Sequence, residues 1–278
     1  MSNLRELQRA AEAVASADAL LIGAGAGMGV DSGLADFRGP QGFWQTYPPY
    51  EKLGLHFTSL ANPRWFATDP ALAWGFYGHR RNLYRATIPH DGFGILLSWA
   101  RRMNAGSFVF TSNVDGHFQK AGFEADRVVE VHGSVDWMQC VDRCDIGILP
   151  ADASEIAVDF ATMRAQAPLP TCPSCGALAR PNILMFSDWQ WDESRTAAQQ
   201  RRLEVWFEAV RNAKLVVVEC GAGTAVPTVR WFCEGLLTHC DATLLRINIR
   251  EPDVPRGQIG LAIRAREALH AIDRLMSR

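Results

Sequence analysis

Four of the seven cysteines in this chain occur as two close pairs, Cys140 with Cys144 and Cys172 with Cys175. The pairs are separated by 27 residues, so two turns of the chain can offer four thiolates in tetrahedral geometry to one zinc ion. Two unrelated pairs of free thiols are the alternative. We expect a closed, structural zinc site, and we interpret the remaining cysteines as small buried hydrophobic residues: Cys220, Cys233 and Cys240.

A glycine-rich segment is the second group with chemical potential. Residues 25–39 follow a short apolar run and have the sequence GAGMGVDSGLADFRG. A strand that ends in glycines before a helix offers backbone N–H groups and a positive dipole end, which together bind a pyrophosphate. Tight turns and close packing also need glycine, so the pattern alone leaves a structural turn open. Phe37, which could cover a nicotinamide ring, and Arg38, which could reach a phosphate, favour a dinucleotide site.

Polar residues follow two further apolar runs. His132 comes after the run at 127–131, and an imidazole with a pKa near about 6.5 can act as a base at neutral pH. The alternative for His132 is a hydrogen-bonded core histidine. Asn113 and Asp115 alternate after another run, so both can face one pocket, although both types are also common in turns. We interpret His117 as a solvated or hydrogen-bonded helix residue.

A weaker signal lies in a predicted helix of the segment 41–104. Tyr77 and Arg80 are three residues apart and therefore share one helical face. A phenol beside a guanidinium can bind a carboxylate. The alternative is a packed tyrosine beside a solvated arginine, and a small shift of register would bring Arg81 inward in place of Arg80.

A parallel α/β sheet is the element that must position these residues. Helical patterns at 200–213, 228–238 and 262–276 surround apolar runs that are typical of buried strands. Alternation of strands and helices predicts a doubly wound, Rossmann-like parallel sheet. The predicted strands are residues 19–22, 107–111, 127–131, 214–218 and 243–248.

Two segments interrupt this alternation. Residues 41–104 are rich in Trp, Phe, Tyr and Pro and are typical of helices with irregular connections, and residues 136–180 contain the cysteine pairs. We therefore expect a smaller domain made of a helical insertion at 41–104 and a zinc-ribbon insertion at 136–180. The sheet domain would then be discontinuous and comprise residues 1–40, 105–135 and 181–278.

Taken together, these segments resemble motifs of the sirtuins, the NAD-dependent protein deacylases. Five segments occur in the family's order and span nearly the whole chain, which is far more specific than any one motif. They are GAGMGVDSGLADFRG at 25–39, TSNVDGH at 111–117, EVHGS at 130–134, RPNILMFSD at 180–188 and INI at 247–249.

The resemblance implies an NAD-dependent protein lysine deacylase (a deacetylase or desuccinylase) that contains zinc, acts on acylated proteins or peptides, and releases nicotinamide and O-acyl-ADP-ribose. It implies that His132 and Asn113 are catalytic and that Tyr77, Arg80 and Phe186 contact the substrate, with Tyr77 and Arg80 binding the carboxylate of an acidic acyl group. The residues that would contact NAD are Gly25, Ala26, Gly27, Asp36, Phe37, Arg38, Ser112, Asn113, Asp115, Gly221, Gly223, Thr224 and Asn248.

The chain departs from the family pattern around the expected cofactor site. Gly29 replaces a serine, Ala35 a proline and Ser112 a glutamine, and residues 220–227 read CGAGTAVP where the family has a GTS loop. An ADP-ribosyltransferase or NAD hydrolase that uses the same pocket is therefore an alternative, as is a non-catalytic NAD-sensing module. Retention of His132, Asn113 and Asp115 together argues against a pure sensor, which needs no base.

Composition narrows the class of protein further. A net charge of −2 and a pI near 6.4 give no electrostatic footprint for nucleic acid or for an anionic membrane surface. There is no apolar run of about 18 residues, and residues 1–17 predict an amphipathic helix without the features of an export signal. We therefore expect a cytoplasmic protein that binds neither nucleic acid nor membrane. Nothing in the sequence specifies an oligomeric state.

Overall fold

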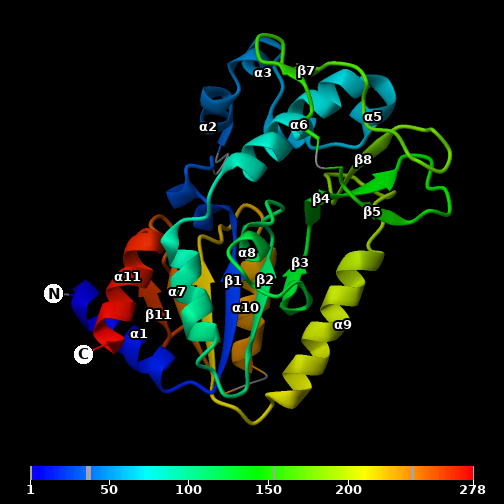
Figure 1. Cartoon of the computed structure of the whole chain (residues 1–278). Coiled ribbons are helices and arrows are strands. Elements are labelled where there is room, and N and C mark those ends of the chain that lie inside the picture. Colours follow the sequence, from blue (N-terminus) through cyan, green and yellow to red (C-terminus); the bar gives the residue numbers. More distant parts are fainter. Residues whose placement is uncertain (1, 36–38, 153, 239–240, 278) are drawn as a thin grey trace.

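The computed structural model describes residues 2–35, 39–152, 154–238 and 241–277. Within them, the central sheet has six parallel strands in the order β11-β10-β9-β1-β2-β3 (Figure 1). The predicted doubly wound parallel sheet is confirmed. Its strands are β1 (Ala19–Ala24), β2 (Ser107–Thr111), β3 (Val128–Glu130), β9 (Leu215–Cys220), β10 (Ala242–Ile247) and β11 (Ile259–Leu261).

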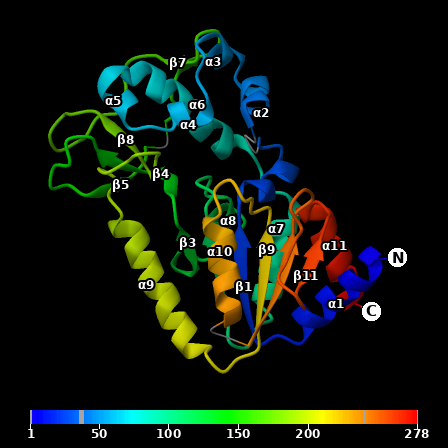
Figure 2. The same cartoon turned by 180° about the vertical axis from the view of Figure 1, so that it is seen from behind.

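Helices cover both faces of this sheet, as Figures 1 and 2 show from opposite sides. One layer contains α1 (Ser2–Ala15), α7 (Asp91–Ala100) and α11 (Ala265–Met276), and the other contains α9 (Ser194–Ala209) and α10 (Thr228–Gly235). Every residue of β1 and β9 is buried, because side chains of a central parallel strand enter both helix layers in turn. Leu20 and Ile22 accordingly join the core under α1 and α7, whereas Leu21 joins the core under α9 and α10.

Several predicted bounds differ from the structure. The helix predicted at 200–213 begins six residues earlier, at Ser194, and ends at Ala209. The helix predicted at 262–276 begins at Ala265, and the three residues between it and strand β11 form an irregular connection. Strand β11 itself was not predicted, since Ile259-Gly260-Leu261 is too short for a periodic signal.

A second core lies beyond the C-terminal ends of the sheet strands and joins the two insertions (Figure 1). The helices are α2 (Gly39–Thr46), α3 (Pro48–Lys52), α4 (Phe57–Leu60), α5 (Arg64–Thr68) and α6 (Pro70–Ala86). The strands are β4 (Gly133–Cys140), β5 (Ile148–Pro150) and β8 (Ala179–Ile183) in one antiparallel sheet, and β6 (Val158–Asp159) and β7 (Arg164–Ala165) in another. Helix α7 falls within the predicted helical insertion but packs on β1 and α11, so by its contacts it belongs to the sheet layer.

Short elements complete the connections. They are the single turn α8 (His117–Lys120) and the 3-10 turns η1 (Ala26–Met28), η2 (Val30–Ser32), η3 (Ala125–Arg127) and η4 (Leu236–Thr238). In the part of the chain that the structure describes, no helix is long and apolar enough to cross a membrane.

Candidate active site

A cavity of about 880 Å³ opens between the C-terminal ends of the parallel strands and the second core. In the sheet, β2 and β3 lie on one side of β1, and β9, β10 and β11 lie on its other side, so the strand order reverses at β1. Ligands of open α/β sheets bind at such a switch point. Most of the predicted site residues line this one cavity. They are Gly25, Ala26, Tyr77, Arg80, Ser112, Asn113, Asp115, His132, Phe186, Gly221, Gly223 and Thr224.

The remaining predictions fall elsewhere. Among the described residues, Gly27 and Asn248 lie near the cavity but do not line it. Asp36, Phe37 and Arg38 lie outside the described residues.

The glycine loop after β1 packs against a second turn that follows β9. A Cβ atom added to Gly25 would lie 2.7 Å from the Cα atom of Ala222, and one added to Gly27 would lie 2.7 Å from that of Gly221. Gly221 has a φ of 64°, a conformation that favours glycine. The glycines therefore let the loops after β1 and β9 approach each other closely.

The expected helix after this loop is not formed. The chain continues instead as the 3-10 turns η1 and η2, each of three residues. Turns this short carry little of the macrodipole that a long helix would provide. The backbone N–H of Gly25 donates to the carbonyl of Cys220, so an anion bound beside this loop would depend on single N–H groups such as that of Ala26.

Asn113 is held beside the glycine loop by a chain of hydrogen bonds. The Thr111 hydroxyl donates to the carbonyl of Ala24 at 3.0 Å and accepts the backbone N–H of Asn113 at 3.0 Å. The Asn113 side-chain amide then donates to the carbonyl of Gly25 at 3.0 Å. The loops after β1 and β2 are thereby locked together at the cavity wall.

Asp115 lies two residues after Asn113 and also lines the cavity. Burial raises the pKa of its carboxyl, and the backbone N–H of His117, which donates to Oδ1 at 3.0 Å, opposes that rise. The interpretation of His117 as solvated or hydrogen-bonded was wrong. Its imidazole is buried against Phe93, with ring centroids 5.9 Å apart, and neither ring nitrogen has a hydrogen-bond partner among the described residues.

His132 follows β3 and is partly buried in the cavity wall. Its Nε2 atom lies 3.5 Å from the hydroxyl oxygen of Thr228. Burial lowers the pKa of this imidazole, and a hydrogen bond with the backbone of Ser112 partly offsets the change. The strand end is anchored by the buried Glu130 carboxylate, which pairs with Arg195.

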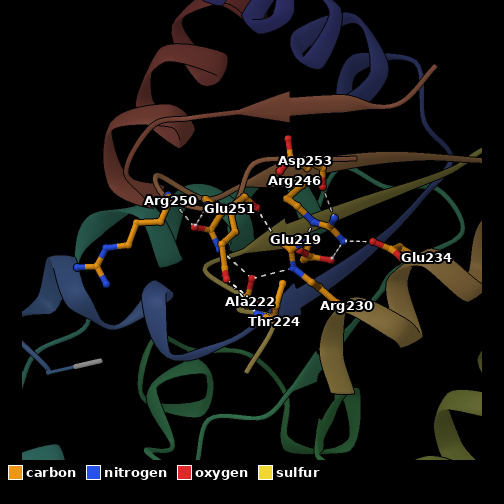
Figure 3. Close-up of polar contacts among 10 residues, drawn as sticks. Glu219, Ala222, Thr224, Arg230, Glu234, Arg246, Arg250, Glu251 and Asp253 are labelled. Carbon is orange, nitrogen blue, oxygen red and sulfur yellow. Dashed lines mark hydrogen bonds and ion pairs between the residues drawn. The ribbon is translucent and has the colours of Figure 1, made fainter. Parts of the chain in front are cut away.

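The loop after β9 is fixed by a polar network that reaches the cavity (Figure 3). The backbone N–H and hydroxyl of Thr224 both donate to the carboxylate of Glu251, at 3.2 and 2.6 Å. Arg230 donates to the carbonyls of Ala222 and Glu251. Glu251 lines the cavity and was not predicted, because its side chain reaches the site only through the fold of the segment after β10.

Asn248 supports this loop from behind. Its amide nitrogen donates to the carbonyl of Ala222 at 2.8 Å, and its amide oxygen accepts the backbone N–H groups of Arg250 and Glu251. The predicted ribose contact of Asn248 stays a prediction.

A buried ion pair joins β9 to β10 beneath the same loop (Figure 3). Arg246 donates to both carboxylate oxygens of Glu219, at 2.6 and 2.9 Å, and to Glu234 at 2.8 Å. The side chains of Arg246 and Glu219 are 1% and 0% exposed, so the removal of either partner would leave a buried charge.

The opposite wall of the cavity is aromatic and cationic. Tyr77, Arg80 and Tyr84 project from α6, and all three are buried. Arg80 donates from Nε and Nη2 to the Tyr84 hydroxyl at 2.9 and 2.6 Å. Sequence analysis missed Tyr84, although its spacing of four residues from Arg80 on a helix could have found it.

Arg81 does not share this wall. It is absent from the cavity lining within the described chain, and its Nη1 atom approaches the carbonyl of Ser154 at 3.4 Å. Burial lowers the pKa of Arg81 to about 10, with a contribution from the nearby charge of Arg85. Of the two adjacent arginines, Arg80 is therefore the one that faces the cavity.

Phe186 lies on the loop after β8, at the mouth of the cavity. Its backbone N–H donates to the carbonyl of Ala61 at 2.8 Å, and its ring meets that of Phe57 edge-on at 6.2 Å. A buried ion pair between Arg180 and Asp188, 2.8 Å apart, closes this loop. The loop leaves Trp189 93% exposed, so its outer side presents apolar surface beside the cavity.

The four predicted zinc ligands meet in the zinc-ribbon insertion. Sγ of Cys140 lies 3.5 Å from Sγ of Cys175, and Sγ of Cys144 lies 3.4 Å from Sγ of Cys172. All four sulfur atoms lie within 4.8 Å of one another. A tetrahedral ion with bonds of about 2.3 Å needs sulfur atoms about 3.8 Å apart, so the cluster fits zinc. Of the other cysteines, Cys220 and Cys233 are buried as expected, and Cys240 lies outside the described residues.

Comparison with known proteins agrees with this geometry. The model of the Sir2 family matches residues 25–206. A Pyrobaculum aerophilum protein named NAD-dependent protein deacylase 2 is 30% identical over 260 residues, which cover 93% of this chain and 91% of that protein. A probable bifunctional ADP-ribose hydrolase/ADP-ribosyltransferase of Fusarium oxysporum f. sp. cubense is 29% identical over 255 residues, 87% of this chain and 42% of that protein.

The fold is shared with a solved complex of a Sir2 homologue with NAD. The two superpose with a TM-score of 0.68 at 22% identity, and the match covers 97% of this chain and 93% of that one. Together with the match to the family model over more than half of the chain, these findings confirm the resemblance carried by the motifs: the chain belongs to the Sir2 family, the sirtuins.

Proposed function

We propose that this chain is an NAD-dependent protein lysine deacylase that prefers acyl groups ending in a carboxylate. The observation that carries the proposal is that one cavity combines two kinds of wall. His132, Asn113 and Asp115 form its sheet side, and Arg80 with two tyrosines forms its insertion side. The first set suits cofactor chemistry, and the second suits recognition of an acidic acyl group.

NAD fits the sheet side of the cavity. The volume lies within the range of about 300–1,000 Å³ that ligand pockets commonly have. Backbone N–H groups of Ala26 and Gly223 would hold the pyrophosphate, since those of Gly25 and Gly221 already donate to the carbonyls of Cys220 and Ile247. Asn113 with Asp115 would hold the nicotinamide end. When bound, NAD supplies an electrophilic ribose carbon to which the acyl oxygen is transferred.

His132 acts as the general base in this proposal. Its lowered pKa keeps the imidazole neutral at physiological pH, so it can accept a proton from a ribose hydroxyl. Thr228 and the backbone of Ser112 hold the ring in place. Asn113, locked to Gly25, orients the groups around the reacting carbon.

Arg80 supplies the acyl preference. Its guanidinium is enclosed by the rings of Phe57, Phe76 and Tyr84 at 5.6, 5.2 and 5.3 Å. A buried cation of this kind binds a carboxylate strongly, because little water screens the pair. The acylated peptide would enter beside Phe186 and the exposed Trp189.

The zinc cluster has a structural part in this proposal. Its cysteines do not line the cavity in the described chain, and four thiolates leave zinc no open position for substrate. Zinc would hold together the insertion that carries strands β4 and β8. His132 directly precedes β4 and Ile183 is the last residue of β8, and both line the cavity.

A panel of peptides that differ only in the acyl group tests the proposal. Each peptide is incubated with and without NAD, and deacylation is followed by mass spectrometry. We expect turnover that requires NAD and is fastest for succinyl- or malonyl-lysine. Turnover of acetyl-lysine alone would refute the acyl preference, and formation of ADP-ribosylated protein without deacylation would favour ADP-ribosyl transfer.

A further inference from the structure

We propose that Tyr84 reads the acyl carboxylate together with Arg80 and is a further specificity-determining residue of the site. The inference deepens the proposed function and rests on it. Tyr84 adds a hydroxyl hydrogen-bond donor to the pair formed by Tyr77 and Arg80.

The position of Tyr84 follows from the geometry of α6. Residues four apart on a helix lie on one face, so the Tyr84 ring stacks beside the Arg80 guanidinium, 5.3 Å from ring centroid to Cζ. Nε and Nη2 of Arg80 both donate to the same phenol oxygen, at 2.9 and 2.6 Å. Arg80 and Tyr84 are 8% and 7% exposed, and both line the cavity.

These two hydrogen bonds determine what the phenol can still do. A phenol oxygen accepts through its lone pairs and donates through its single O–H. Arg80 occupies the accepting side, so the group that remains for a ligand is the O–H donor. Burial raises the pKa of Tyr84, so the hydroxyl keeps its proton at neutral pH.

The ligand that satisfies this donor must be a hydrogen-bond acceptor. A carboxylate at the end of a succinyl or malonyl group can accept from the Tyr84 O–H and pair with the charge of Arg80. The methyl group of an acetyl chain can do neither.

Tyr77 differs from Tyr84 in its contacts. Its side chain is 1% exposed, and the structure gives its hydroxyl no hydrogen bond to Arg80 among the described residues. Its ring packs on Phe66 and Phe76 at 5.9 and 5.0 Å. Tyr77 lines the same pocket, and Tyr84 adds a hydroxyl that Arg80 orients.

Peptide binding measured without NAD tests the inference, because the peptide is not consumed when the cosubstrate is absent. Calorimetry gives the dissociation constants of a succinyl-lysine and an acetyl-lysine peptide of the same sequence, and their ratio measures selectivity. We expect Tyr84→Phe to reduce selectivity for the succinyl peptide about tenfold, which corresponds to about 1.4 kcal/mol. Tyr50→Phe is the matched control, since its buried hydroxyl bonds the carbonyl of Met163 at 3.2 Å and does not line the cavity. It should leave the ratio unchanged.

The variant Arg80→Met distinguishes failure of the role of Tyr84 from failure of the proposed acyl preference. If Arg80→Met reduces selectivity and Tyr84→Phe does not, the role of Tyr84 is refuted and the proposed acyl preference stands. If Arg80→Met leaves the ratio at the wild-type value, the proposed preference itself fails.

A second variant covers the case in which Tyr84→Phe does not fold after the Arg80 guanidinium loses two hydrogen bonds. The double variant Arg80→Met with Tyr84→Phe removes the charge as well. Compared with Arg80→Met alone, it should reduce selectivity about threefold further, because the phenol donor is lost. Equal ratios for the two variants would overturn the role of Tyr84.

Discussion

The Nε2 atom of His132 lies 3.5 Å from the hydroxyl oxygen of Thr228, the first residue of α10. With the backbone of Ser112 as its other partner, the imidazole is held between the loop after β2 and the helix that follows the cofactor-side loop after β9. Three segments distant in sequence therefore meet at the proposed base.

The pH dependence of the reaction follows from this position. Burial lowers the pKa of His132 below 6.5, so the neutral base persists as the pH falls and is lost only when the pH passes the lowered value. The acidic limb of a pH profile of kcat/KM should accordingly have its midpoint below 6.5. A midpoint above 6.5 in the wild-type enzyme would contradict the assignment of His132 as base.

Removal of one zinc ligand should destabilise the small domain. Cys172→Ser is expected to lower the zinc content from one ion per chain to near zero and to lower the unfolding temperature, because a structural zinc contributes folding free energy directly. Ser174→Ala, in the same turn, is the control and should retain the metal. Elemental analysis that finds no zinc in wild-type protein purified without chelator would refute the site.

Adjacent arginines offer a matched pair for the acyl preference. Arg80→Met should reduce kcat/KM for a succinyl-lysine peptide about ten- to a hundredfold, and far less for acetyl-lysine, because a charge-assisted contact is lost from one substrate only. Arg81→Met removes a buried charge that does not line the cavity, so it should leave the ratio of the two rates unchanged. An equal loss on both substrates in Arg80→Met would show that Arg80 supports structure instead.

The loop that carries Phe186 contains a residue in an unfavourable conformation. Ser187 has a φ of 58° and an exposed side chain, and a side chain in this left-handed region costs roughly 1–2 kcal/mol relative to glycine. Ser187→Gly should therefore raise the free energy of unfolding by about 1 kcal/mol, after the greater freedom of glycine in the unfolded chain is allowed for. Ser187→Val should lower it. Denaturant unfolding of the two variants checks the sign, and a destabilised glycine variant would contradict the argument.

Much of the sheet could be predicted because its strands are long, apolar and buried on both faces. The runs at 19–22, 107–111 and 214–218 fall on β1, β2 and β9. Strand β11 has only three residues with a central glycine, so it produced no clear signal. Strands β4 and β8, in the antiparallel sheet of the insertion, produced none either. Their pairing depends on contacts distant in sequence.

Site residues could be predicted where they follow the C-terminal end of a predicted strand. Asn113 and His132 lie two residues beyond the ends of β2 and β3, and both line the cavity. Glu251 was missed because its partners Thr224 and Arg230 become its neighbours only when β9 and β10 pair. Side-chain partners of this kind are set by tertiary structure and leave no local pattern.

Analysis of the reaction products tests the central claim most directly. Wild-type enzyme with NAD and a succinyl-lysine peptide should yield nicotinamide, free lysine peptide and O-succinyl-ADP-ribose in equal amounts by mass spectrometry. His132→Ala, which keeps the cavity but lacks the base, should form none of the acyl-ADP-ribose while calorimetry still detects NAD binding. Free ADP-ribose or ADP-ribosylated protein from the wild-type enzyme, without acyl-ADP-ribose, would contradict the account.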